Sequence, residues 1–272
     1  MPELPEVETT RRGIAPHVTG RSVLRVDVYD RRLRWPVPAD LEARMRGATI
    51  DRVDRRSKYL LLRSGTAALL VHLGMTGSLR IWHEPPPRTR HDHVDIAFAD
   101  GTTLRYRDPR RFGAMLWVES DVERHPLLAS LGPEPFDPAF DADYLWRRTR
   151  SRSAAIKLAL MDNRVVTGVG NIYANEALFR AGIRPALSSR GVSKPRLARV
   201  VASVRDVLAE AIAKGGSTLR DYVGSDGASG YFQLGYFVYG RAGEPCRVCA
   251  STIRVSRIGQ RSSFHCPKCQ RR

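Results

Sequence analysis

The chain is short of acidic residues, of cysteine outside one segment, and of long apolar runs. Its 272 residues include 28 Asp and Glu against 45 Lys and Arg, a formal net charge of +17. That imbalance favours a polyanionic partner, and nucleic acid is the first candidate, although charge alone does not identify it. No apolar N-terminal stretch has the character of a signal peptide, and no run is long enough to span a membrane. We therefore expect a cytoplasmic protein without a membrane partner.

The four cysteines lie together near the C-terminus. They form two Cys-x2-Cys pairs, Cys246 with Cys249 and Cys266 with Cys269, at a spacing that lets four thiolates surround one Zn²⁺ tetrahedrally. Two disulfides are the competing interpretation, which a reducing cytoplasm disfavours. Because four thiolates leave no open position for water, we predict one structural zinc ion.

Positive charge is concentrated around these cysteines, where Glu244 is the one acidic residue. A solvated basic tail would also account for such a composition. A rigid, densely positive module is better explained by contact with phosphate groups. The cations are Arg241, Arg247, Arg254, Arg257, Arg261, Lys268, Arg271 and Arg272.

The N-terminal segment predicts a helix, because Pro5 suits a first turn. Val7 and Ile14, seven residues apart, would face one core. Gly13 and Pro16 are expected to end the helix.

Short strands are predicted between residues 22 and 118, where several runs are apolar or partly alternate apolar and polar residues. Several strands at this spacing suggest an antiparallel sandwich. The runs are 23–29, 59–62, 67–73, 94–98 and 103–107.

The second half of the chain has helical periodicity. Residues 131–138 contain three prolines and predict a linker. Helices are expected at 154–161, 171–181 and 197–212, with a glycine-containing turn between the first two and a stop at 214–216. The predicted fold class is α+β. A cleft between the β-rich and helical halves is the expected binding site for DNA.

Pro2 is a potential nucleophile if Met1 is removed. The small side chain of Pro2 favours removal of the methionine before it. A terminal amine has a reference pKa near ~7.7–8.0, so roughly a tenth is unprotonated at neutral pH. With Met1 attached, the Pro2 nitrogen is an amide and cannot attack. An ordinary helix start is the alternative interpretation of this segment, and both can hold together because a helix start is a rigid mount.

The start of the chain, Pro2 to Thr9, resembles that of the formamidopyrimidine-DNA glycosylases, bacterial enzymes that excise oxidised purines such as 8-oxoguanine. Further matching segments occur in the family's order along nearly the whole chain. They are residues 57–60, 72–75, 108–113 and 168–176 and the four cysteines.

The resemblance implies two domains. Residues 2–131 would form an N-terminal antiparallel β-sandwich with an N-terminal helix, and 132–142 a linker. Residues 143–235 would form a helical domain with a helix–two-turn–helix motif, and 236–272 a β-hairpin zinc finger. It also implies a protein that binds damaged double-stranded DNA and needs no nucleotide cofactor. A monomer is the default expectation, which nothing in the sequence tests.

The implied activity is that of a bifunctional DNA glycosylase and lyase. The Pro2 amine would attack C1′ of an everted nucleotide, and Glu3, otherwise a helix-start carboxylate, would protonate the sugar. Glu6 would orient Pro2 and shuttle protons. Lys58, flanked by apolar residues on a predicted strand, would contact the phosphate beside the lesion; by itself it would be a surface cation. Arg261 would bind phosphate and donate the proton for the second elimination.

Met75, Arg110 and Phe112 would fill the hole that an extruded base leaves. An apolar wedge stabilises a kinked stack, and arginine can hydrogen-bond the orphaned base. Taken singly, Met75 and Phe112 would be core residues. The resemblance makes them wedge residues on two loops.

Phosphate contacts are implied for Asn171, which follows a glycine-containing turn whose N–H groups could cradle an anion or merely connect two helices. Arg152 and Lys157, on the preceding helix, are further phosphate candidates. The family also assigns DNA contacts to His72, His91 and Tyr239. His91 could instead be a strand-edge histidine.

Two further features bear on specificity. His91 and His93 could suggest a metal, but no third ligand is evident. Residues 217–231, rich in glycine, would close over the flipped base in the resembled family, whereas 234–237 depart from the family pattern.

Two alternatives remain. An endonuclease VIII-type enzyme prefers oxidised pyrimidines, but its start replaces residues 4–6 and it lacks a matching capping loop. A non-catalytic zinc-ribbon protein would need the finger and arginines, but has no use for a Pro-Glu terminus.

Overall fold

The computed structural model describes residues 2–216 and 235–271. Within them the chain forms two compact units, one of residues 2–129 with 214–216 and the other of 130–213 with 235–271. The predicted capping loop at 217–231 and residue 234 lie outside the described residues, and the predicted domain boundaries stay a prediction.

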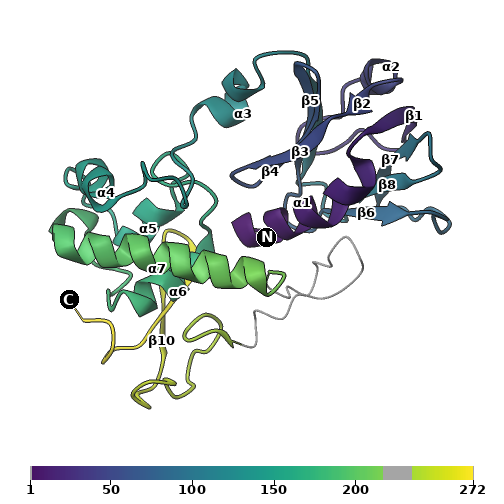
Figure 1. The fold of residues 1–272 in the computed structure, drawn as a ribbon. Helices are drawn as coiled ribbons and strands as arrows, with labels where there is room; N and C mark the ends of the chain where they lie inside the picture. The colour runs from purple at the N-terminus through teal and green to yellow at the C-terminus, as the bar shows by residue number, and fades with distance from the viewer. Residues whose placement is uncertain (1, 217–234, 272) are drawn as a thin grey trace. The chain divides into compact units, whose positions relative to one another are not determined.

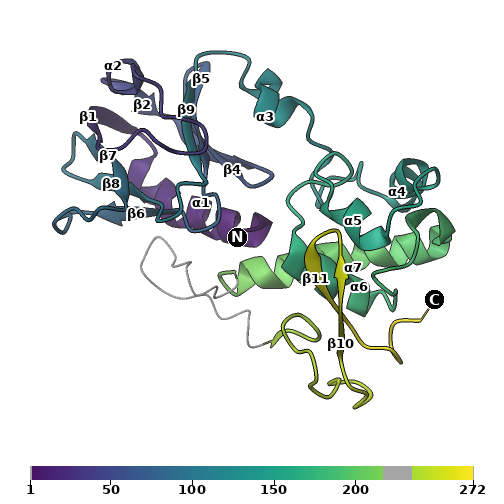
Figure 2. The same cartoon turned by 180° about the vertical axis from the view of Figure 1, so that it is seen from behind.

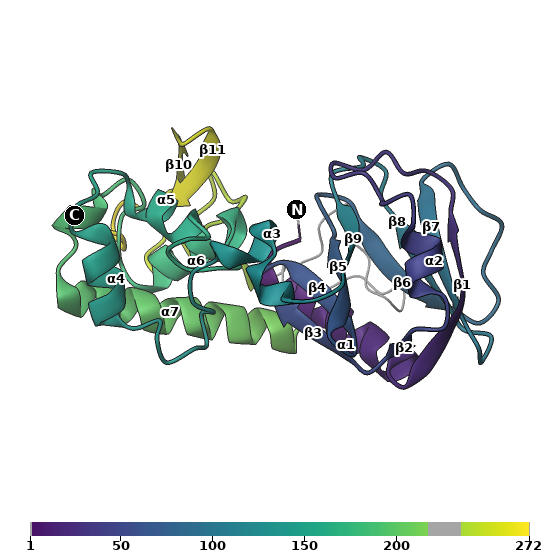
Figure 3. The same cartoon turned by 90° about the horizontal axis from the view of Figure 1, so that it is seen from above.

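The first unit contains two antiparallel sheets, which Figures 1 and 3 show as separate layers. One has the order β2-β1-β7-β8-β6 and the other β3-β4-β5-β9. The predicted antiparallel sandwich is thereby confirmed. The strands are β1 (Arg21–Val28), β2 (Thr49–Ile50), β3 (Arg52–Arg56), β4 (Tyr59–Ser64), β5 (Ala67–His72), β6 (Ser78–Trp82), β7 (Asp92–Phe98), β8 (Thr103–Arg107) and β9 (Ala114–Val118).

Both sheets contribute to one apolar core. Leu62 and Val71 from the four-stranded sheet and Ile96 and Leu104 from the five-stranded sheet are fully buried in it. Short helices α2 (Leu41–Met45) and α3 (Pro126–Ala129) complete the unit. The alternation expected in β8 is incomplete, because Arg105 is also buried.

The N-terminal helix α1 (Leu4–Val18) buries Val7 and Ile14 as predicted. The expected stop at Gly13 and Pro16 is wrong, since Pro16 lies inside the helix. Burial of Val18 outweighs the poor helix propensity of these two residues. The N–H of Thr19 closes the last turn on the Ala15 carbonyl at 3.0 Å.

The second unit is helical and carries a β-hairpin, seen beside α5 and α6 in Figures 2 and 3. The expected linker at 131–138 has neither helix nor strand, and the three predicted helices correspond to α5, α6 and α7. Among the described residues, every helix is too short or too polar to cross a bilayer. The elements are α4 (Ala142–Thr149), α5 (Ile156–Met161), α6 (Asn171–Arg180), α7 (Lys194–Ala213), β10 (Arg254–Ile258) and β11 (Arg261–His265).

The buried arginine of β8 is held by a bidentate ion pair. Arg105 donates from Nε and Nη2 to the two carboxylate oxygens of Asp95, at 2.8 and 2.7 Å, and both side chains are buried. Arg105 also donates to the Pro86 carbonyl.

We expect Arg105→Met to lower the free energy of unfolding by about 3–5 kcal/mol, because it leaves the buried Asp95 carboxylate without its charged partner and with the Tyr29 hydroxyl as its remaining side-chain donor. Urea unfolding at neutral pH measures the change. Arg25→Gln, which breaks an exposed pair with Asp27, is the matched control and should have a much smaller effect. Equal effects of the two substitutions would contradict this account of the sandwich.

Candidate functional site

The start of α1 is enclosed and rigid. Pro2, Glu3 and Glu6 are all buried. Glu3 and Glu6 form a reciprocal capping box in which the Glu3 N–H donates to the Glu6 carboxylate at 2.8 Å and the Glu6 N–H donates to the Glu3 carboxylate. Gly216, in the left-handed region at φ +82°, packs on Glu6, and a Cβ there would lie 3.2 Å from Glu6 Oε1. The helix start is therefore a fixed mount for residue 2, whatever that residue does.

Lys58 lies in the two-residue turn between β3 and β4, and its predicted position on a strand is wrong. The turn forms because Ser57 adopts a left-handed conformation, at φ +59°, and lets Arg56 pair with Tyr59. Lys58 is buried, so it is not a surface cation.

A cluster of charged residues ties this turn to α1. Glu8 on α1 accepts hydrogen bonds from Arg11, Arg12 and Arg55 at 2.8–3.2 Å. Burial raises the pKa of Glu8, but these arginines outweigh it and hold that pKa below its usual value. Arg55 also donates to the Ser57 carbonyl at 2.9 Å. The turn that carries Lys58 is thus positioned from the helix that carries Pro2.

His72 ends β5 as a neutral imidazole. Burial, and then the positive charges of Lys58 and Arg34, lower the pKa of His72 to about 4, with Asp108 opposing. Its Nδ1 accepts the N–H of Gly74 at 3.1 Å, which leaves the proton on Nε2. His72 can therefore act as a hydrogen-bond donor but carries no charge at neutral pH.

Met75, Arg110 and Phe112 lie on two adjoining loops, residues 73–77 and 108–113, which we call the wedge loops. Gly74, at φ +61°, approaches so closely that a Cβ there would lie 2.5 Å from the Phe112 carbonyl carbon. The core interpretation of Phe112 is wrong, because this side chain is 42% exposed. Arg110 covers its ring, with 4.7 Å between the guanidinium and the ring centroid. An apolar side chain and a cation are thus presented together.

The two histidines near β7 have different environments. His91, in the turn before the strand, is partly exposed and receives a hydrogen bond from Arg90 at 3.2 Å. His93 is buried, with Nε2 2.8 Å from the Asp108 carbonyl oxygen. Within residues 2–216 and 235–271, neither belongs to a cluster of three or more metal-ligating side chains.

In the second unit, Lys157 and Asn171 converge on the tip of the hairpin. The Lys157 ammonium donates to the Ser262 carbonyl at 2.8 Å, and Asn171 Nδ2 donates to the same oxygen at 3.2 Å. Asn175 accepts the N–H of Phe264 at 2.8 Å. Lys157 is fully buried, and its hydrogen bond holds the hairpin against α5 and α6. Its predicted contact with phosphate stays a prediction. Arg261 lies next to Ser262 and is exposed.

Arg152 precedes α5 and does not lie on it, contrary to expectation. The helix begins only at Ile156, and Arg152 binds Asp162 at 2.9 Å, at the start of the α5–α6 connection. The remaining predicted contact, Tyr239, packs edge-on against Phe264 with 5.2 Å between ring centroids.

Tyr239 is positioned by a buried carboxylate that was not predicted from the sequence. Glu176 on α6 accepts the backbone N–H groups of Phe237, Val238 and Tyr239 at 2.8–3.0 Å. Burial raises the pKa of Glu176, and the three N–H groups oppose that rise. The only sequence signal was an acidic residue on the predicted helix 171–181, which by itself indicates no partner.

The four cysteines are placed as a zinc site requires. Their sulfur atoms all lie within 4.8 Å of one another, and none forms a disulfide. The distances of 3.9 Å between Cys246 and Cys269 and 3.4 Å between Cys249 and Cys266 are close to the ~3.8 Å edge of a tetrahedron with Zn–S bonds of ~2.3 Å. The residues therefore fit one structural Zn²⁺, and the disulfide interpretation is excluded.

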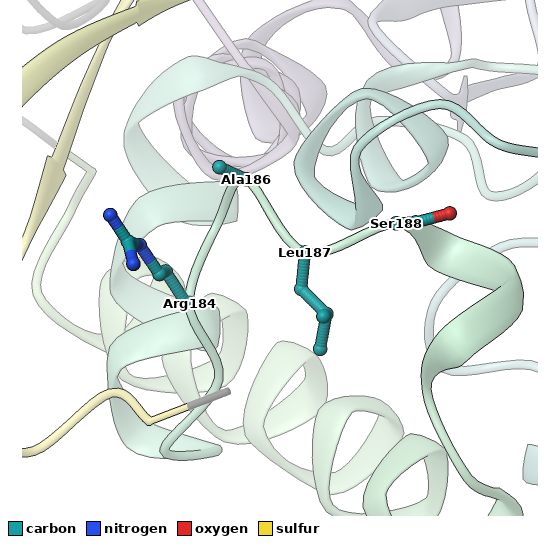
Figure 4. A pocket seen from close by; sticks show the side chains of 4 residues that line it. All are labelled: Arg184, Ala186, Leu187 and Ser188. Carbon is teal, nitrogen blue, oxygen red and sulfur yellow. The ribbon is translucent and has the colours of Figure 1, made fainter.

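A surface pocket of about 300 Å³ lies apart from these groups in the sequence. Figure 4 shows its lining, which comes from the segment after α6. Arg184, Ala186, Leu187 and Ser188 line it, and none is a predicted site residue. The predicted site residues lie elsewhere, in two groups. The first unit contains the start of α1 and the wedge loops, and the second contains the hairpin with α5 and α6.

Comparison with known proteins finds matches along nearly the whole chain. Sequence models of the Formamidopyrimidine-DNA glycosylase N-terminal domain, the Formamidopyrimidine-DNA glycosylase H2TH domain and the Zinc finger found in FPG and IleRS match residues 1–115, 131–223 and 243–272. The chain is 57% identical to the Formamidopyrimidine-DNA glycosylase of Stutzerimonas stutzeri (strain A1501) and 54% identical to that of Hahella chejuensis (strain KCTC 2396). Both alignments cover all of each protein.

Solved structures show the same fold. The MutM (Fpg) protein of Thermus thermophilus matches with a TM-score of 0.88 and 41% identity, over 99% of this chain and 98% of that one. A complex of Lactococcus lactis Fpg with DNA containing an abasic site matches with a TM-score of 0.91 and 32% identity, over 99% and 100%.

We expect Cys249→Ser to abolish stoichiometric zinc binding and loosen the hairpin, because the site loses one of four thiolates. Atomic absorption would measure the metal, and amide hydrogen exchange would measure protection of β10 and β11. Ser256→Ala, an exposed change on β10, is the control. Full zinc content in the cysteine variant would contradict the assignment.

His72 should make the protein less stable as the pH falls from about 6.5 to about 4. In this window the unfolded state binds a proton at His72 and the folded state does not. The free energy of unfolding therefore falls by up to about 3 kcal/mol. Urea unfolding at pH 7 and pH 5 should show a smaller loss for His72→Gln than for the unsubstituted protein. An imidazole that titrates near 6.5 by NMR would overturn this.

Proposed function

Because this chain belongs to the formamidopyrimidine-DNA glycosylase family, as its motifs predict, we propose that it excises oxidised purines, including 8-oxoguanine and formamidopyrimidines, from duplex DNA in base excision repair. The observation that carries the proposal is the buried Pro2-Glu3 pair on a rigid helix start, in the same unit as the Lys58 turn and the wedge loops. Lactococcus lactis relatives are described in complexes with DNA containing an abasic site or Fapy-dG.

The proposed reaction begins with the Pro2 amine, freed by removal of Met1. Its nitrogen forms a bond to C1′ of the everted nucleotide while the bond from C1′ to the base breaks. The nitrogen then loses its proton, and Glu3, as an acid, protonates the ring oxygen of the sugar. The bond from C1′ to that oxygen breaks as the nitrogen lone pair forms the iminium. Glu6, which accepts the Glu3 N–H, holds this helix start in place and is the candidate to orient Pro2.

Strand cleavage follows from the covalent intermediate. The iminium acidifies the 2′ hydrogen, so β-elimination breaks the strand on the 3′ side, and δ-elimination removes the sugar. Lys58 and Arg261 are the proposed proton donors for these steps. The zinc ion is structural, and the proposed chemistry uses no nucleotide cofactor.

DNA binding would draw on both units of a monomeric protein. The wedge residues would fill the space left by the everted base, with Arg110 on the estranged partner. Asn171 and Arg261 would contact phosphate, in keeping with the net charge of +17.

A nicking assay tests the proposal. A duplex with 8-oxoguanine opposite cytosine should be cleaved to leave a one-nucleotide gap, faster than a duplex with thymine glycol. Preference for thymine glycol would indicate an endonuclease VIII-type specificity. Binding without cleavage of either duplex would indicate a non-catalytic DNA-binding protein.

The nucleophile has a separate test. Borohydride should trap a protein–DNA adduct on the lesion duplex, with the added mass on the Pro2 peptide. A two-residue extension ahead of Pro2 keeps every side chain but turns the amine into an amide, and should abolish trapping. An adduct mapped to a lysine would refute the assignment.

Glu3→Gln should separate the two activities. The amide preserves an oxygen acceptor for the helix cap but cannot serve as an acid, so base excision should fall steeply. Nicking of a preformed abasic site should be retained, because its open-chain aldehyde condenses with Pro2 without protonation of a ring oxygen. Equal loss of both activities would contradict the role of Glu3.

A further inference from the structure

Asp108 is a buried carboxylate on which both wedge loops converge. Its Oδ1 accepts the Thr76 hydroxyl at 2.7 Å and the Arg110 N–H at 3.3 Å, and its Oδ2 accepts the Gly113 N–H at 2.9 Å. The Arg110 N–H also donates to the Thr76 hydroxyl oxygen at 3.1 Å. One carboxyl group therefore joins the loop that carries Met75 to the loop that carries Arg110 and Phe112.

The backbone of Asp108 extends this network to the neighbouring strands. Its N–H donates to the His91 carbonyl at 3.0 Å, and its carbonyl oxygen is 2.8 Å from His93 Nε2. The hydroxyl of Tyr106 is shared between the Asp108 carboxylate, at 3.3 Å, and the His72 carbonyl, at 3.2 Å.

The partners of Asp108 are informative because they are neutral. Across residues 2–216 and 235–271, no lysine or arginine forms an ion pair with this fully buried carboxylate. Its carboxylate instead accepts hydrogen bonds from backbone N–H groups and a hydroxyl of the loops, and from the Tyr106 hydroxyl of β8. A buried carboxylate is stable only when such donors surround it, so its demand for partners orders the loops.

We propose that Asp108 is a positioning residue that preassembles Met75, Arg110 and Phe112 into a single wedge before DNA is bound. The inference rests on the proposed function, since the wedge has a use only where a base leaves a duplex. Preassembly removes the need to order two loops during eversion. Asp108 acts through Thr76, which touches both Asp108 and Arg110 but has no role in the proposed chemistry.

The test compares two substitutions at Thr76. Thr76→Val keeps the shape of the side chain but removes the hydroxyl, whereas Thr76→Ser keeps the hydroxyl. On a duplex with 8-oxoguanine opposite cytosine, Thr76→Val should lower kcat/KM about tenfold, and Thr76→Ser should restore most of it. Asp108→Asn should reproduce the loss.

A second substrate separates positioning from general damage to the fold. A single-stranded oligonucleotide with an abasic site leaves no hole in a duplex, so its nicking by Thr76→Val should stay within about twofold of the unsubstituted rate. Thr149→Val removes a buried hydroxyl bonded only within α4 and is the control for stability.

The outcomes are distinct. Equal losses on both substrates, or a duplex activity that Thr76→Val and Asp108→Asn leave unchanged, would overturn the inference. If the unsubstituted protein nicks neither substrate, the proposed function itself fails.

Discussion

The pair of hydrogen bonds between Glu3 and Glu6 fixes the position of Pro2 in space, and the proposed chemistry depends on that position. A terminal amine is reactive wherever it is, but it is useful only if it is held against one atom of a substrate. The capping box places Pro2 on a buried helix start, and Gly216 packs on the same Glu6 carboxylate. Glu8 and Arg55 then relate the Lys58 turn to the same helix.

Buried carboxylates organise this basic protein from within. Glu6, Asp108 and Glu176 each accept backbone N–H groups, and they hold the N-terminus, the wedge loops and the Tyr239 segment respectively. The acidic residues are few, and these three have internal roles. Over the described part of the chain, the side chains of Arg254, Arg257 and Arg261 on the hairpin make no hydrogen bond or ion pair. Positive charge on the finger is thus left for a polyanion.

The features that could be predicted are those set by nearby residues. Apolar periodicity located α5, α6 and α7, short apolar runs located the strands, and Cys-x2-Cys spacing located the zinc site. Errors occurred where tertiary packing or an unusual backbone conformation decides the outcome. Pro16 remains helical because Val18 is buried in the sandwich, and Lys58 lies in a turn because Ser57 adopts a left-handed conformation. Asp108 and Glu176 were missed as organising residues, since their partners lie on other loops and strands.

The proposed mechanism requires that the working protein begins with the free amine of Pro2. Intact-mass measurement of purified protein that cleaves the lesion duplex at full rate tests it most directly. We expect a mass that lacks the initiator methionine throughout the active population. Full activity from protein that still carries Met1 would contradict it, because the Pro2 nitrogen would then be an amide.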